Sequence, residues 1–164
     1  MFSMATTMKG QFKAALVTHP GFEDVAATEV QELTGAKAAT AAAGVITFQV
    51  KKLTELCRLC YLSQSASSVV FLFSEFAIEK TAAATAENMR KSLKDVDFPM
   101  WFSRETTFKV VFDSAAGEEF GFPASDFEAA AGEVIIGQVK AGSGYVPKVD
   151  LKSPLVTIAV CASG

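Results

Sequence analysis

Residues 11–35, QFKAALVTHPGFEDVAATEVQELTG, begin with apolar side chains at every second position, which predicts a half-buried strand. The His-Pro-Gly sequence at 19–21 breaks that strand. Apolar residues then recur at helical spacing and predict the buried face of a helix: Phe22, Val25, Ala26, Val30 and Leu33. Gly35 suits the end of this helix. A strand, a tight turn and a helix therefore open the fold.

The next four elements complete a known supersecondary order. Residues 36–50 predict two short strands around Gly44, because the VITF sequence that follows it has high strand propensity. Residues 51–65 predict a helix. Residues 67–78 predict a strand, and their Val-Val-Phe-Leu-Phe run indicates burial on both faces. The resulting order, β-α-β-β-α-β, is that of the ferredoxin-like split motif.

A second α/β unit follows in the sequence. Its predicted elements are a helix at 81–98, a strand at 105–114, a helix at 125–142 and strand pieces at 148–151 and 153–164. Ser125 and Glu128 have the spacing of a capping box at the start of the later helix. The predicted fold class is therefore α/β (α+β), with a ferredoxin-like β-α-β-β-α-β domain at 10–76 and a second α/β domain at 77–164.

The composition is that of an ordinary globular protein. Of the 164 residues, 50% are hydrophobic and 20% are charged. No apolar run approaches the roughly 20 residues that cross a bilayer. The N-terminus lacks the basic and apolar regions of a secretory signal, and the 3 cysteines do not suggest a disulfide framework. We therefore expect a cytoplasmic protein with no membrane partner.

The Cys-x-x-Cys pair, Cys57 and Cys60, has three interpretations: a metal site, a redox motif or part of a core. A structural zinc ion needs about four ligands, and the chain offers only Cys161 and His19 besides the pair. A redox motif belongs at a strand-to-helix turn. Both cysteines instead fall inside the predicted helix, on an apolar stripe: Leu53, Leu56, Cys57, Cys60 and Tyr61. We therefore interpret them as core residues and expect no metal.

Basic residues are locally concentrated, although the net charge of −3 does not indicate nucleic-acid binding. Lys140, Lys148 and Lys152 lie near the C-terminus, where Asp150 is the only acid after Glu133. A partner responds to the charge of the face it meets, so a local basic surface is compatible with the acidic total. The simpler interpretation is that these lysines are separate surface charges that only keep the protein solvated. A binding role requires that they lie together on one face.

The sequence contains no catalytic constellation. Paired-carboxylate, HExxH, P-loop and GxSxG signatures are all missing. Gly142-Ser143-Gly144 follows a helix and precedes a strand, which indicates a helix end and not a phosphate-binding loop. His19 has no serine or cysteine nucleophile placed by sequence to partner it. We expect no enzymatic activity from this chain alone.

Six segments, taken in order, resemble the N-terminal region of THUMP-domain RNA methyltransferases. In the first half they are THPGFEDVAATEVQELTGAKA at 18–38, GVITF at 44–48 and LCRLCYLSQSASSVVFLFSEF at 56–76. In the second half they are TTFKVVFD at 106–113, SDFEAAAGEVIIGQVK at 125–140 and YVPKVDLKSPLVTIAV at 145–160. The resemblance covers about residues 12–161 and rests on the order and spacing of the motifs.

This resemblance implies a ferredoxin-like domain followed by a THUMP-like domain, together binding tRNA or rRNA. It implies base methylation, of the N2-guanine type, by an S-adenosylmethionine-dependent catalytic domain in cis or in trans. That domain carries an Asn/Asp-Pro-Pro-aromatic motif, whereas the 5 prolines here include no adjacent pair. We therefore expect the catalytic domain and its cofactor to lie outside this chain. The residues expected to contact RNA are Lys109, Lys140, Lys148, Lys152, Arg104 and Trp101.

The sequence departs from the family pattern in one motif. The serine-arginine stretch of the family has arginines where this chain has Gln64 and Ser68. Two alternatives to the RNA-recognition module therefore stay open. In the first alternative, the chain is a stand-alone adaptor that recruits a separate RNA-modifying enzyme. In the second, it is an α/β interaction domain that does not bind RNA.

Overall fold

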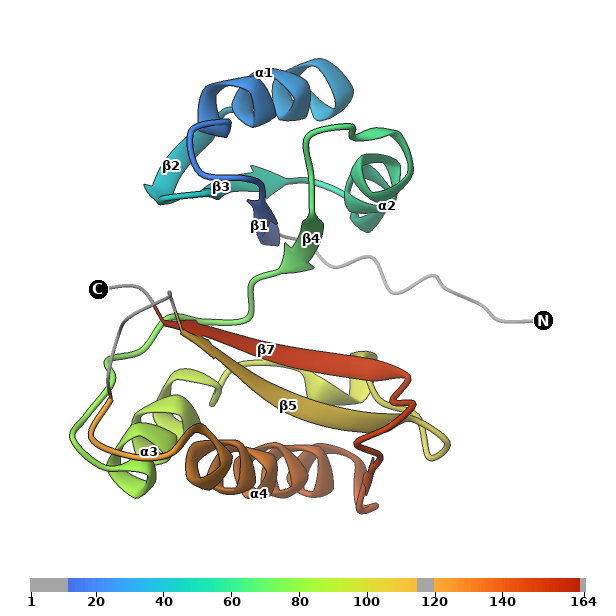
Figure 1. Ribbon diagram of the computed structural model, residues 1–164. Coiled ribbons are helices and arrows are strands. Elements are labelled where there is room, and N and C mark those ends of the chain that lie inside the picture. The colour runs from blue at the N-terminus through green and yellow to red at the C-terminus, as the bar shows by residue number, and fades with distance from the viewer. Residues whose placement is uncertain (1–11, 115–119, 163–164) are drawn as a thin grey trace. The chain divides into compact units, whose positions relative to one another are not determined.

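The computed structural model describes residues 12–114 and 120–162, and the chain divides into two compact units (Figure 1). The N-terminal unit is Met1–Phe73 and the C-terminal unit is Ser74–Gly164. Each is described by itself below. In the described ranges, no helix is both long and apolar enough to cross a membrane.

The N-terminal unit has the predicted β-α-β-β-α-β order. Its elements are β1 (Phe12–Val17), α1 (Glu23–Thr34), β2 (Ala38–Ala42), β3 (Val45–Val50), α2 (Leu53–Leu62) and β4 (Ser68–Phe71). The strands form an antiparallel sheet in the order β2-β3-β1-β4. In this order the edge strands are β2 and β4, and each of them is the last strand of one β-α-β half. This arrangement confirms the ferredoxin-like fold.

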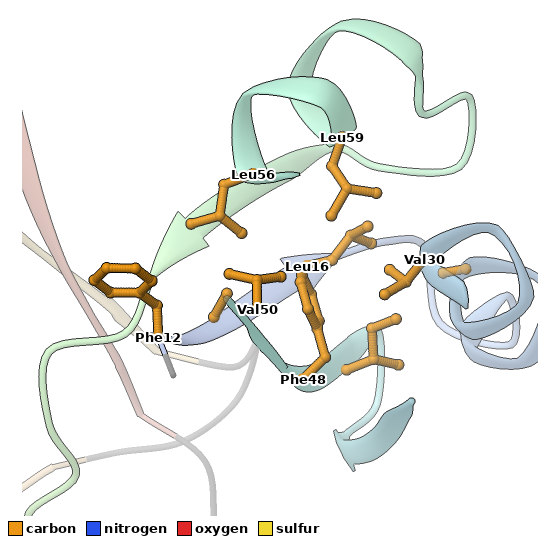
Figure 2. Close-up of a cluster of buried hydrophobic side chains, with 10 residues drawn as sticks. Phe12, Leu16, Val30, Phe48, Val50, Leu56 and Leu59 are labelled. Atoms are coloured by element: carbon orange, nitrogen blue, oxygen red, sulfur yellow. The ribbon is translucent and has the colours of Figure 1, made fainter. Parts of the chain in front are cut away.

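The core of this unit lies between the sheet and its two helices (Figure 2). Alternate residues of β1 and β3 point to the same side, because Leu16 pairs with Ile46 and Phe12 pairs with Val50 in the antiparallel register. Val30 of α1 and the two buried leucines of α2, Leu56 and Leu59, close over them. All of these side chains are less than one-tenth exposed, so the apolar alternation of the sequence is used as predicted.

The buried faces of α1 and β4 differ from the prediction. Phe22 and Val25 are exposed, and the buried residues of α1 are Ala26 and Val30. Strand β4 is shorter than predicted and is half-buried, because it pairs only with β1 at one end of the sheet. An edge strand cannot be covered as a central strand is, so its apolar run does not mean burial on both faces.

The prediction that Cys57 and Cys60 are core residues is wrong. The buried residues of α2 are Leu56 and Leu59, whereas both cysteines are exposed and Tyr61 is 88% exposed. The helix is rotated relative to the predicted stripe, so that Leu59 faces the sheet. A leucine side chain buries more apolar surface than a cysteine, and this rotation therefore gives the larger hydrophobic gain.

The C-terminal unit is a three-stranded parallel sheet with helices. Its described elements are α3 (Ala82–Ser92), η1 (Phe98–Met100), β5 (Thr107–Ser114), α4 (Ala124–Ser143), β6 (Lys148–Val149) and β7 (Val156–Ala162). Strand β5 lies between β6 and β7 and is parallel to both. Helices α3 and α4 lie on one side of β5 and β7 (Figure 1). The predicted α/β architecture of this half is therefore confirmed.

Phenylalanines fill the space between this sheet and α4. The ring of Phe112 packs edge-on against Phe127, with 5.1 Å between the ring centroids. Phe108 and Phe127 are fully buried. The predicted capping box of α4 is wrong, because the helix begins at Ala124 with no side-chain cap and Glu128 instead accepts a 2.9 Å hydrogen bond from the Phe112 N–H. This bond joins α4 to the strand it covers.

Candidate nucleic-acid interface

The three parallel strands of the C-terminal unit all begin at the same end of the sheet. Thr107 of β5 is in register with Lys148 of β6, and β7 begins beside Phe108 at Val156. The segments that lead into these strands, 101–106, 144–147 and 150–155, therefore meet there. We call these segments, with the first residue of each strand, the amino edge. Helix α4 runs from β5 back to β6, so its C-terminal end also lies at this edge.

Hydrogen bonds between the segments hold the amino edge together. The Tyr145 hydroxyl donates to the Phe102 carbonyl at 2.5 Å. The Leu155 N–H donates to both the carbonyl and the hydroxyl oxygen of Thr107, each at 3.1 Å. The Asp150 N–H donates to the Phe108 carbonyl at 3.0 Å. Backbone that is tied in this way presents its side chains in a fixed arrangement.

The Asp150 carboxylate shapes the turn that carries Lys152. It accepts hydrogen bonds from the N–H groups of Ser153 at 3.0 Å and Lys152 at 2.9 Å. These two bonds hold the pKa of Asp150 below its ordinary value. The carboxylate therefore serves the turn, and Lys152 beside it is exposed.

Four of the six predicted residues belong to the amino edge. Lys148 begins β6 and is exposed, as are Lys152 and Arg104. Arg104 lies in a turn closed by the Thr106 hydroxyl, which accepts a 2.9 Å hydrogen bond from the Ser103 N–H. Trp101 ends the short helix η1 and is half-buried. The structure therefore gathers residues as far apart in the sequence as Trp101 and Lys152.

The other two residues flank this edge on different sides of the sheet. Lys109 is the third residue of β5 and is half-buried. Its neighbours Phe108 and Val110 face the helices, so Lys109 lies on the opposite face of the sheet. Lys140 is exposed in the last turn of α4, on the helix side. These six residues therefore share one end of the unit but do not form one flat face.

Charge is distributed unevenly along α4 and its connections. The sequence from 113 to 133 contains no lysine or arginine, and its acids in the described ranges are Asp113, Asp126, Glu128 and Glu133. The basic residues follow at the other end of the helix. Acids near a helix N-terminus and a lysine in its last turn both agree with the helix dipole. The amino edge is thus the more positive end of the described C-terminal unit.

Exposed apolar side chains, which no sequence pattern marked, lie among these cations. Leu151 is 73% exposed and Leu155 is 72% exposed, and Val146 and Val149 are about half exposed. Leu151 and Leu155 belong to the predicted strand pieces 148–151 and 153–164, and no sequence pattern indicated that their side chains are exposed. A surface of cations around apolar groups suits a polyanion that also offers flat apolar bases.

The amino edge falls within a recognised domain. Residues 83–161 match the THUMP domain family. The C-terminal unit contains a THUMP domain. This finding and the fold confirm the resemblance on which the RNA-binding residues were predicted. No curated protein matches the sequence.

Solved structures similar to this THUMP-containing chain share its fold. One is a predicted N6-adenine-specific DNA methylase from Listeria monocytogenes, with 16% identity and a TM-score of 0.72, over 93% of this chain and 37% of that one. TrmN from Thermus thermophilus is 21% identical with a TM-score of 0.63, over 92% and 42%. A 4-thiouridine synthetase solved with RNA and ATP is 14% identical with a TM-score of 0.54, over 92% and 38%. The chain thus spans about two fifths of the length of these proteins.

The serine-rich loop, where this chain departs from the THUMP methyltransferase pattern, is held by one carboxylate of the N-terminal unit. Glu29 of α1 accepts hydrogen bonds from the Ser63 hydroxyl at 2.5 Å and the Gln64 N–H at 2.7 Å, and from the hydroxyl and the N–H of Ser65. Burial opposes ionisation, but these bonds outweigh it and lower the pKa of Glu29 to about 2. Gln64 thus contributes its backbone to this anchor.

Replacing Glu29 by glutamine is expected to destabilise the N-terminal unit by about 1 kcal/mol at pH 7, a value discounted for solvent screening. The carboxyl titrates at about 4.5 in the unfolded chain and at about 2 in the folded one. Its contribution is therefore complete above pH 4.5 and is lost as the pH falls toward 2. Urea unfolding at pH 7 and pH 3 measures this. The exposed Glu32→Gln is the control, and an equal loss for both variants would contradict the role of the loop anchor.

Proposed function

We propose that this chain is the RNA-binding part of an RNA-modifying enzyme and that structured RNA lies across the amino edge. The observation that carries the proposal is the meeting of Arg104, Lys148 and Lys152 around exposed apolar side chains within the THUMP domain. The cations bind phosphates, which gives affinity without sequence readout. Trp101 and the exposed leucines meet bases or sugars that are not covered by pairing.

The comparisons support an RNA partner. The 4-thiouridine synthetase with the same fold was solved as a complex with RNA. Proteins that modify RNA need a part that holds the folded substrate while a separate site performs the chemistry. A surface fixed by backbone hydrogen bonds, such as the amino edge, is suited to that holding task.

The finer proposal concerns the enzyme to which the module belongs. Solved proteins with this fold include methylases, and the sequence motifs resemble those of THUMP-domain RNA methyltransferases. We assign the chain to an S-adenosylmethionine-dependent enzyme that methylates a guanine base of tRNA or rRNA. The methyltransferase domain is supplied in the same longer polypeptide or by a separate protein. We assign no residue of this chain to the cofactor, which supplies the methyl group at the catalytic domain.

Filter binding of the chain to unmodified tRNA, over a series of salt concentrations, tests RNA binding directly. Three phosphate contacts predict that the logarithm of the association constant falls with the logarithm of the salt concentration with a slope of about −2 to −3. Binding that is absent at about 0.1 M salt, or that does not depend on salt, would contradict the proposal. Absent binding would favour the interaction domain that does not bind RNA.

A further inference from the structure

The Cys-x-x-Cys pair of α2 lies on the surface of the N-terminal unit. Cys57 and Cys60 are free thiols and both are exposed. We expected no metal because the sequence offers only Cys161 and His19 as further ligands and because the pair fell on a predicted core face. Leu56 and Leu59 occupy that buried position instead. The thiols are therefore accessible to an ion and to the ligands of another molecule.

The spacing of the two cysteines suits one metal ion. Residues three apart on a helix are neighbours on its surface, with about 5–6 Å between their Cβ atoms. Zinc binds thiolates at about 2.3 Å in a tetrahedron, which places two sulfurs about 3.8 Å apart. Rotation about χ1 brings the sulfurs of Cys57 and Cys60 toward that separation, and α2 keeps its helical backbone. The pair thus supplies two of the four ligands.

The remaining two ligands are not found beside the pair. Within the ranges 12–114 and 120–162, no group of three or more histidine, cysteine or acidic side chains is placed to hold a metal. The pair therefore supplies at most half of the four ligands that a structural zinc ion needs. We propose that Cys57 and Cys60 bind a zinc ion together with the same two cysteines of a second copy of this chain. A twofold axis through the ion completes the tetrahedron with identical halves.

The surface around the pair fits a second copy of itself. Tyr61 follows Cys57 by one helical turn on the same face of α2 and is 88% exposed. An apolar stripe of this kind on a solvent-facing helix is suited to packing against a like helix.

The binding step needs no oxidant or reductant. Four thiols lose four protons to the solvent as four sulfur–zinc bonds form, and no electron is transferred. Because protons compete with zinc for the sulfurs, the affinity falls as the pH is lowered. The inference is independent of the proposed RNA-binding function, since the pair lies outside the THUMP domain.

Sedimentation of the whole chain with added zinc tests the proposal, in the presence of a phosphine reductant that keeps the thiols reduced. We expect the mass to double from 17.4 kDa at one zinc ion per two chains, and a chelator to reverse the change. Cobalt should show the absorption bands of a tetrahedral four-thiolate site. Cys57→Ser and Cys60→Ser should each abolish the zinc-induced dimer, whereas Cys161→Ser should retain it.

Several results would overturn the proposal. A chain that stays monomeric with excess zinc, or binds one zinc ion per chain, would do so. A zinc-dependent dimer that survives Cys57→Ser or is lost in Cys161→Ser would place the ion elsewhere. Circular dichroism of the serine variants verifies that the exposed substitutions leave the fold intact. A dimer that forms only without reductant and resists the chelator would indicate a disulfide between copies instead.

Discussion

Replacing Arg104, Lys148 and Lys152 together by glutamine is expected to weaken tRNA binding by about 100-fold at 0.15 M salt. Each phosphate contact releases one condensed counterion and contributes about fivefold to the association constant at that salt concentration. All three side chains are exposed, so the substitutions leave the hydrophobic core untouched. Equilibrium filter binding at constant salt measures the loss. Circular dichroism and the thermal midpoint verify that the variant is folded.

The matched control removes the same charges elsewhere in the same unit. Lys80, Arg90 and Lys91 are also two lysines and one arginine, they are exposed, and they lie at or near α3. Arg90 forms an exposed pair with Glu87 at 3.5 Å, which contributes little to stability. Their replacement by glutamine should change the affinity by less than about threefold, because it lowers only the long-range attraction. Equal losses for the two triple variants would show that total charge, and not the amino edge, determines binding.

Gly44→Ala is expected to destabilise the N-terminal unit by about 3 kcal/mol or more. Gly44 turns the β2–β3 hairpin with a φ of +72°, and a Cβ atom there would lie 2.6 Å from the Thr18 carbonyl oxygen. Its own backbone is fixed in that place, because its carbonyl accepts a 2.7 Å hydrogen bond from the Thr18 N–H and its N–H donates to Glu23 at 2.5 Å. The added methyl group therefore meets backbone that cannot move away. Chemical unfolding measures the difference in the free energy of unfolding.

Gly35→Ala separates the two causes of this loss. Gly35 ends α1 with a φ of +75°, nearly that of Gly44, but a Cβ atom there has nothing within 4 Å. It should cost only the strain of a left-handed residue, about 1 kcal/mol. If both variants lose the same stability, the close approach of the added Cβ atom to the Thr18 carbonyl does not contribute to the loss, which would contradict this explanation.

The order of the elements could be predicted because it depends on local patterns. Strand alternation, helical spacing and breaker residues each occupy a few neighbouring positions, and they gave the correct order in both units. The orientation of α2 could not be predicted in the same way. Leucines and cysteines both count as apolar in a stripe, so two faces of the helix fit the pattern. The larger area of Leu59 decides between them only once the helix packs on the sheet.

The candidate site depends on contacts between distant residues. Arg104 and Lys148 were named from their residue types, but their common position follows from the parallel pairing of β5 with β6. The bonds of Glu29 to the serine loop join residues 34 to 36 positions apart. No pattern along the chain marks such a partner. Leu151 belongs to a segment that resembles a family motif, and such a motif does not indicate whether a side chain is buried or exposed.

The slope of tRNA affinity against salt, measured for the whole chain and for the amino-edge triple glutamine variant, tests the central claim most directly. The slope counts the phosphates that the protein neutralises, and it is independent of contacts that release no ions. We predict that the slope of the variant is less steep by about 2 to 3, as expected when three phosphate contacts are removed. An unchanged slope would contradict the account, because the phosphates would then be held by other residues.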